Sequence, residues 1–379
     1  MGALYLYRNF TAMRRLTILL LLLCFVYVAY AQEQGCFRRA ANSELRMEGN
    51  TKLRRYRSFF VGEFHGVYGV PEVKLALIKY VHEHNDVNHI FMEIGYSTAW
   101  LYNQYLQTGD TTLFTEPLLP YAQKQVNRDF WKELYAYNSG LKHKLTIHGM
   151  DFERMDFIKV LKLMIPAGKA RPAQIAGMLQ FIDSITITSV NADIHSNEHT
   201  GAELIALYDS IRNNINNNRK LYREYFGSKN FEYVQRIMFN ENTFGRYNER
   251  NSHMYANVMN DIDDYSLKHF IVFAGLNHAG TQGGTLCSML AGEYNIKNRF
   301  TSIAMVCKDC YDWQQQPQYR YLPYRAAGAY GSDTTMLGEL YKNYWQGGCN
   351  YILLPSSTAG DRAAAFSQYL LLMKDQPEF

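Results

Sequence analysis

The chain has 379 residues, a formal net charge of +4 at pH 7 and 47% hydrophobic residues, enough for one large core or a core with an inserted subdomain. Three arginines and no acidic residues lie within the first 31 positions, so the remaining basic residues nearly balance the 35 Asp and Glu. The sequence has no basic stripe, and its 30 Tyr and 21 Phe are not clustered with Lys or Arg. Composition therefore excludes a nucleic-acid-binding protein of the usual basic kind.

The N-terminus has the pattern of a secretory signal peptide. Arg14 and Arg15 precede an apolar run over 16–30, which closes with Ala29-Tyr30-Ala31. The run is shorter than the roughly 20 apolar residues that a membrane-spanning helix needs. We therefore expect residues 1–31 to be removed, leaving an exported protein, periplasmic or secreted, without a stable membrane anchor.

Short apolar runs followed by helical periodicity predict βα units in the first half of the chain. Strands are expected over 58–62, 88–92 and 144–149, and helices over 71–84, 97–106 and 128–141. From about 155 to 264 the strand signal nearly vanishes and helical stretches take over. Strands return over 269–274, 299–306, 350–354 and 367–373. The pattern predicts an α/β fold, with a central mostly parallel sheet flanked by helices and an inserted all-helical cap.

This pattern divides the chain into four parts. After the signal peptide, residues 32–154 form the first part of the α/β core, 155–264 the helical cap, and 265–379 the second part of the core. No internal repeat, low-complexity tract or linker rich in Pro or Ser interrupts this organisation.

Five cysteines remain after position 31, which is an odd number for a compartment that oxidises thiols. At least one must stay free or pair between chains. Cys307 and Cys310 form a C-x-x-C pair that is compatible with a redox pair, half of a zinc site or a structural disulfide. Because no second C-x-x-C exists and the pair follows a strand, we favour the disulfide.

Acidic residues, histidines and one asparagine lie where the predicted strands end. They are Glu63 and His65, Glu93, Asp151 and Glu153, and Asn277 with His278. In open parallel sheets ligands bind beyond the carboxyl ends of the strands. Each of these residues alone could be a hydrogen-bonded polar group at a strand end, so the prediction of a site depends on their joint occurrence.

These residue types suit hydrolysis with water as the nucleophile. A histidine such as His65 can take a proton from water while Glu63 stabilises the imidazolium, and His278 can polarise a carbonyl or protonate a leaving alkoxide. No Gly-x-Ser-x-Gly nucleophile elbow is present, which argues against a serine hydrolase of the α/β-hydrolase type. The same set of His and carboxylates could also hold a divalent metal, although no spacing makes this specific.

The chain resembles the erythromycin esterase-like superfamily, which also contains the ChaN haem-binding lipoproteins. The similar elements are Gly62-Glu-Phe-His-Gly66, Phe91-Met-Glu-Ile with residues 99–109, His148-Gly-Met-Asp-Phe-Glu, residues 250–257 and Phe273-Ala-Gly-Leu-Asn-His278. The resemblance implies that His65 is the general base, assisted by Glu63, Glu93 and His278. It also implies that Arg250 lines the cleft.

Two hypotheses follow. The first is a secreted hydrolase with catalytic residues Glu63, His65, Glu93 and His278, which binds a small-molecule substrate through Asp151, Glu153, Arg250 and Asn277 and cleaves an ester, lactone or related acyl bond. It requires no cofactor, although a metal-dependent variant stays open. The second is a ChaN-like haem-binding protein without turnover. The long helical insertion favours the first, and the single residue between Glu63 and His65 favours the second or a metal-dependent relative.

Overall fold

A computed structural model describes the backbone of residues 17–18, 35–40, 44–49, 51–67, 69–114, 125–153, 156–185, 198–240, 249–281, 283–293, 296, 299–308, 310–311, 321–322, 342–343, 349–359 and 367–374. The expected signal peptide over 1–31 lies outside this part of the chain except for residues 17–18, so it stays a prediction. Within the described ranges, no helix is both long enough and apolar enough to cross a membrane.

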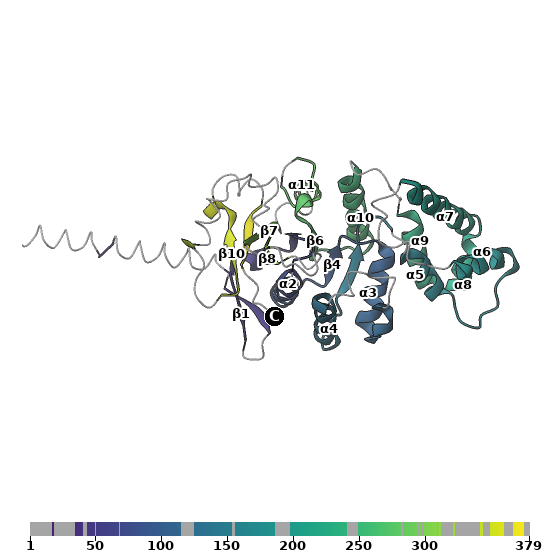
Figure 1. Ribbon diagram of the computed structural model, residues 1–379, viewed down its shortest axis with the longest axis horizontal. Coiled ribbons are helices and arrows are strands. Elements are labelled where there is room, and N and C mark those ends of the chain that lie inside the picture. The colour runs from purple at the N-terminus through teal and green to yellow at the C-terminus, as the bar shows by residue number, and fades with distance from the viewer. Residues whose placement is uncertain are drawn as a thin grey trace, which may run out of the picture.

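A nine-stranded sheet forms the centre of the protein (Figure 1). Its spatial order is β2-β1-β10-β11-β7-β3-β6-β4-β5. The strands β11, β7, β3, β6, β4 and β5 are parallel, whereas β10, β1 and β2 extend the sheet in antiparallel pairs. This arrangement confirms the predicted α/β class with a mostly parallel sheet.

The strands of this sheet match the predicted ones closely. They are β3 (Ser58–Glu63), β4 (His89–Met92), β5 (Thr146–Gly149), β6 (Phe270–Gly275), β7 (Phe300–Lys308), β10 (Tyr351–Pro355) and β11 (Tyr369–Lys374). Every residue of β3 and β6 is buried, because helices cover both faces of the parallel part. A separate pair is formed by β8 (Cys310–Tyr311) and β9 (Tyr321–Leu322).

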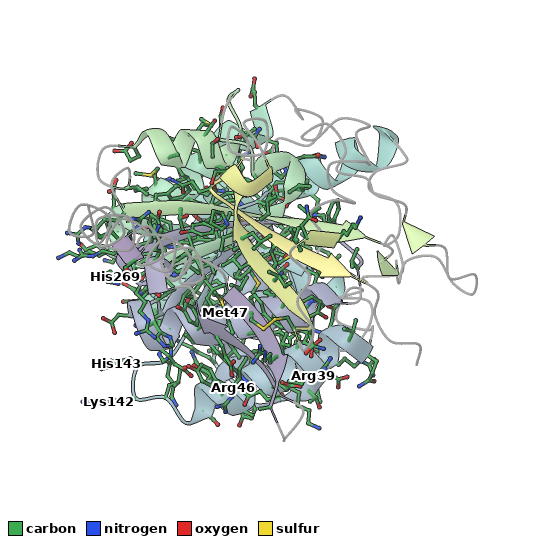
Figure 2. The ribbon with its side chains drawn as sticks, turned by 90° about the vertical axis from the view of Figure 1, so that its left-hand side faces the viewer. Arg39, Arg46, Met47, Lys142, His143 and His269 are labelled. Carbon is green, nitrogen blue, oxygen red and sulfur yellow. A yellow bond between two sulfur atoms is a disulfide. The ribbon has the colours of Figure 1, made fainter. Side chains whose placement is uncertain are left out.

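Sequence reasoning missed two strands at one side of the sheet, β2 (Leu45–Gly49) at its edge and β1 (Gly35–Arg39) beside it. Figure 2 views the sheet from this edge, which is marked by Arg39, Arg46 and Met47. The strands alternate buried and exposed residues over only five positions each, and their exposed ends carry charges. Such short, charged segments resemble loops in sequence, although they suit a sheet edge.

Alternate residues of the central strands point into two separate cores. On one face Phe59, Val61 and Ile271 pack with α2 (Gly69–Asn85), α3 (Tyr96–Thr108) and α4 (Gln125–Ser139). On the other face Phe60 and Val272 pack with α10 (Arg250–Asp264) and α11 (Leu286–Gly292). Figure 1 shows these two helix layers on opposite sides of the sheet.

Most of the predicted cap region is helical. It contains α5 (Asp156–Met164), α6 (Ala173–Ser184), α7 (Glu198–Asn217), α8 (Arg219–Phe226) and α9 (Ser228–Phe239), which lie together at the end of the sheet remote from β1 (Figure 1). The next helix, α10, packs instead against the sheet. The boundary at residue 264 and the role of this region as a cap stay predictions.

A disulfide joins Cys36 on β1 to Cys349, just before β10. The free cysteine found among the described residues is Cys287, which is buried in α11, in keeping with the odd number of cysteines. The side chains of Cys307 and Cys310 lie outside the described part, so the disulfide expected there is untested. Sequence reasoning could not predict this pair, because its two cysteines lie 313 residues apart.

Replacing both Cys36 and Cys349 by serine should lower the free energy of unfolding by about 2–5 kcal/mol, because the bridge restricts the unfolded chain over a very long loop. Chemical denaturation of the oxidised protein with and without reductant measures this effect. The control is the comparison under reductant, where the native protein and the double variant should have equal midpoints because both lack the bridge. Equal midpoints for the variant and the oxidised native protein would contradict the prediction.

Candidate active site

Four neighbouring parallel strands bring the predicted polar residues together at their carboxyl ends. Glu63 ends β3 at the level of Gly275 on β6, and Glu93 and Asp151 follow β4 and β5. The loops before β5 and β6 contain His143 and His269, which lie on the same side of the view in Figure 2, at the opposite, amino-terminal ends of the strands. The site thus occupies the carboxyl ends of the strands, as the βα pattern predicts.

His65 lies between two carboxylates. Its Nδ1 is 3.6 Å from Oε1 of Glu63 and its Nε2 is 3.4 Å from Oε2 of Glu93. The imidazole is 52% exposed, whereas the two glutamates are almost fully buried. His65 is therefore the member of this trio that a molecule in solution can reach.

Contacts between these charged side chains shift the pKa values of His65 and Glu93. Burial disfavours the imidazolium of His65, but the carboxylates of Glu93 and Glu63 outweigh burial and raise its pKa above the ordinary value. Burial likewise opposes ionisation of Glu93, but contacts with His278 and His65 hold its pKa well below the ordinary value. Glu93 is consequently a permanent anion at neutral pH.

Glu93 is the centre of the cluster. Besides His65, its carboxylate accepts a hydrogen bond from the backbone N–H of Gly275 at 2.6 Å, binds Arg250 Nη2 at 2.6 Å and lies 3.5 Å from Nε2 of His278. Its two oxygens therefore link β4 to the ends of β3 and β6 and to α10. A carboxylate with this many partners is fixed in orientation.

Arg250, the first residue of α10, joins two acidic residues. Its guanidinium makes two hydrogen bonds to Asp151, at 3.0 and 2.6 Å, as well as the bond to Glu93. Burial disfavours its charge, but Asp151 and Glu93 outweigh burial and raise its pKa further. Arg250 thus neutralises buried carboxylates and aligns Glu93 for its contacts with the imidazoles.

Two residues that sequence reasoning missed complete the cluster. Lys74 on α2 forms an ion pair with Glu63 at 2.7 Å, and Asn251 accepts a hydrogen bond from Nδ1 of His278 at 2.6 Å. The position of Asn251 beside Arg250, in a segment with a recognisable resemblance, is a signal that could have found it. Lys74 has no such signal, because lysines in helices are usually solvated.

The other two predicted substrate-binding residues do not contact this cluster. Glu153 is fully buried and accepts hydrogen bonds from the N–H groups of Tyr96 and Ser97, which begin α3, and from Asn240 at 2.9 Å. Burial raises its pKa to about 7, against these donors. Asn277 is exposed beside His278. Glu153 is placed to stabilise the helix terminus, and the predicted binding roles of both residues stay untested.

A groove of about 520 Å³ lies elsewhere, between α9 and α10. It is lined by Arg236, Asn257 and Tyr265 among others, and neither His65 nor Glu93 takes part. We place the candidate site at the strand ends because the reactive side chains converge there.

The carboxylates at the strand ends already have cationic partners. Arg250 contacts Glu93 and Asp151, and Lys74 contacts Glu63, so a divalent cation would meet two fixed positive charges. Within the described ranges, no group of three or more His, Cys, Asp or Glu side chains is arranged to hold a metal ion. The residues present thus fit a divalent metal poorly.

Gly275 leaves no room for a side chain. A Cβ there would lie 2.8 Å from Nε2 of His65 and 3.4 Å from Oε2 of Glu93. For the hydrolase that the sequence predicts, we expect Gly275→Ala to displace His65 and lower kcat/KM by about 100-fold, as small misplacements of catalytic groups do. Steady-state kinetics measure the loss. Gly292→Ala is the matched control because its Cβ meets nothing within 4 Å, and equal activity of the two variants would refute the expected crowding.

The fold and site together define an α/β protein with a His and Glu cluster at the carboxyl ends of parallel strands. Solved structures that match it include a Bacillus cereus protein, with 13% identity and a TM-score of 0.56, covering 86% of this chain and 90% of that one. They also include a mutant of the erythromycin esterase EreC in its open conformation (13%, 0.57, 85% and 91%) and a succinoglycan biosynthesis protein (14%, 0.58, 85% and 89%). The chain therefore shares its fold with an erythromycin esterase, which confirms the resemblance at the level of fold. No family model and no curated protein matches the sequence.

Proposed function

We propose that the protein is an erythromycin esterase-like hydrolase in which His65 activates water for attack on an ester, lactone or related acyl bond. The observation that carries this proposal is the placement of a half-exposed imidazole against two buried carboxylates, one of which also contacts a second imidazole. The fold shared with an erythromycin esterase supports it. The substrate is a small molecule.

In this mechanism neutral His65 takes a proton from water as the water oxygen attacks the carbonyl carbon. Glu63 and Glu93 stabilise the imidazolium that forms, because they lie within 3.6 Å of its two nitrogens. His278 then acts on the carbonyl or leaving-group oxygen from the neighbouring strand end. Lys74 pairs with Glu63 and Arg250 pairs with Glu93, and these contacts orient the two carboxylates.

We further propose that the protein is exported. The disulfide between Cys36 and Cys349 supports export, because such bonds persist mainly in oxidising compartments. The pattern of a signal peptide over 1–31 supports it as well. Sequencing the N-terminus of the mature protein tests the expected cleavage after Ala31, and an intact leader would contradict it.

The hydrolase proposal is tested on purified protein with a panel of aryl esters and macrolides, together with a haem titration followed by the Soret band and a measurement of bound metal. Turnover without a stoichiometric Soret shift is the expected result. A tight Soret shift without turnover would overturn the proposal in favour of haem binding. Turnover that stops on chelation and returns with a metal would indicate the metal-dependent alternative.

Activity should rise with pH in the neutral range. Only the neutral imidazole of His65 is a base, and its pKa lies above the ordinary value, so kcat/KM should increase until pH passes that raised pKa. Glu63→Gln removes one of the carboxylates responsible and should move the midpoint to lower pH. A pH profile of each protein measures the midpoints. A wild-type midpoint at or below the ordinary histidine value would contradict the prediction.

A further inference from the structure

Asn251 connects three elements at the edge of the candidate site. It is the second residue of α10, and its Oδ1 accepts a hydrogen bond from Nδ1 of His278, which follows β6, at 2.6 Å. Its Nδ2 donates to the backbone carbonyl of Gly284, just before α11, at 3.3 Å. Figure 1 shows α10 and α11 on the same side of the sheet.

The two contacts together determine which end of the amide faces the imidazole. The carbonyl oxygen of Gly284 only accepts hydrogen bonds, so it must face the amide nitrogen of Asn251. The amide oxygen then faces His278 and also only accepts. Nδ1 of His278 must therefore carry a proton, in the neutral ring as well as in the imidazolium.

This arrangement leaves Nε2 as the nitrogen of His278 that can gain or lose a proton. Nε2 lies 3.5 Å from Oε1 of Glu93, inside the cluster. His65 differs, because each of its two ring nitrogens faces a carboxylate. The two histidines of the site are thus chemically distinct.

We propose that Asn251 is a positioning residue that keeps the proton of His278 on Nδ1, so that Nε2 is the atom that exchanges a proton with the substrate. The inference rests on the hydrolysis proposed above. As the bond from the acyl carbon to the leaving oxygen breaks, that oxygen keeps the electron pair and takes the Nε2 proton. His65, which is half exposed, then releases to solvent the proton that it took from water, and Nε2 of His278 takes up another, so protons balance over one turnover.

The test follows the imidazole nitrogens directly. Long-range ¹H–¹⁵N spectra of protein labelled at histidine distinguish protonated from unprotonated ring nitrogens, and His278→Gln identifies the signals of His278 among the 11 histidines. At a pH where His278 is neutral, the wild type should show the Nδ1–H tautomer. Asn251→Leu should shift the ring to the Nε2–H tautomer or a mixture. Asn260→Leu, at an exposed position of the same helix, is the control and should leave the tautomer unchanged.

A conservative variant separates the contact with His278 from the contact with Gly284. Asn251→Asp keeps an acceptor for Nδ1–H but cannot donate to Gly284, so it should retain the Nδ1–H tautomer and most of the activity. Asn251→Leu should lower kcat by about 100-fold with little change in KM, the lower end of what a positioned acid contributes.

The outcomes separate this inference from the hydrolase proposal. An Nε2–H tautomer in the wild type, or an unchanged Nδ1–H tautomer in Asn251→Leu, would overturn the role of Asn251 whatever the activity. The expected tautomers in a protein that hydrolyses no ester or lactone would overturn the hydrolysis and the proton transfer to substrate, while the positioning of His278 would stand. The expected tautomers with the expected loss of kcat support both.

Discussion

His65→Ala is expected to lower kcat/KM for hydrolysis by about 10²- to 10⁴-fold, the range that a positioned general base contributes. The imidazole is the half-exposed group against the buried carboxylates of Glu63 and Glu93, and these anions cannot replace it because they already bind cations. The loss should appear mainly in kcat, since the base acts in the transition state.

The experiment compares steady-state kinetics of His65→Ala with those of His143→Ala. His143 is exposed in the loop before β5, at the opposite end of the strands (Figure 2), so its removal should leave activity unchanged. Circular dichroism and thermal unfolding establish that both variants fold. A folded His65→Ala variant with wild-type kcat/KM would rule out His65 as the base.

Arg250→Met should destabilise the fold by about 3–5 kcal/mol, because it leaves the buried carboxylates of Asp151 and Glu93 without their cationic partner. Asp151 is 1% exposed and Glu93 is 9% exposed, so water cannot easily replace the guanidinium. Activity should fall as well, since Glu93 loses the contact that orients it between His65 and His278. Chemical denaturation measures the change in stability.

Two further variants test whether loss of the buried ion pairs causes the destabilisation. Arg46→Met removes an arginine whose side chain is 64% exposed and paired with Glu44, so it should change the stability little. Combining Arg250→Met with Asp151→Asn should recover part of the stability, because one of the unpaired charges is removed. An Arg250→Met protein as stable as Arg46→Met would show that the buried ion pairs contribute nothing.

The strands of the parallel sheet were predictable because burial on both faces requires continuous apolar runs, as in β3 and β6. The edge strand β2 and its neighbour β1 were not, since five residues with charged ends have no distinctive pattern. The disulfide between Cys36 and Cys349 could not be predicted either. It depends on β1 pairing with β10, which joins residues more than 300 positions apart.

The sequence by itself determined which residues stand at the carboxyl ends of the strands, because a βα pattern orders strand ends whatever the details of packing. That reasoning named Glu63, His65, Glu93 and His278, and the resemblance added Arg250. Only the tertiary structure decided which of the candidates meet: Asp151 joins the cluster through Arg250, whereas Glu153 lies at the start of α3. It also added Lys74 and Asn251, from helices whose positions are set by long-range packing. Local pattern specifies an element and its ends, whereas contacts between side chains distant in sequence depend on how the elements pack.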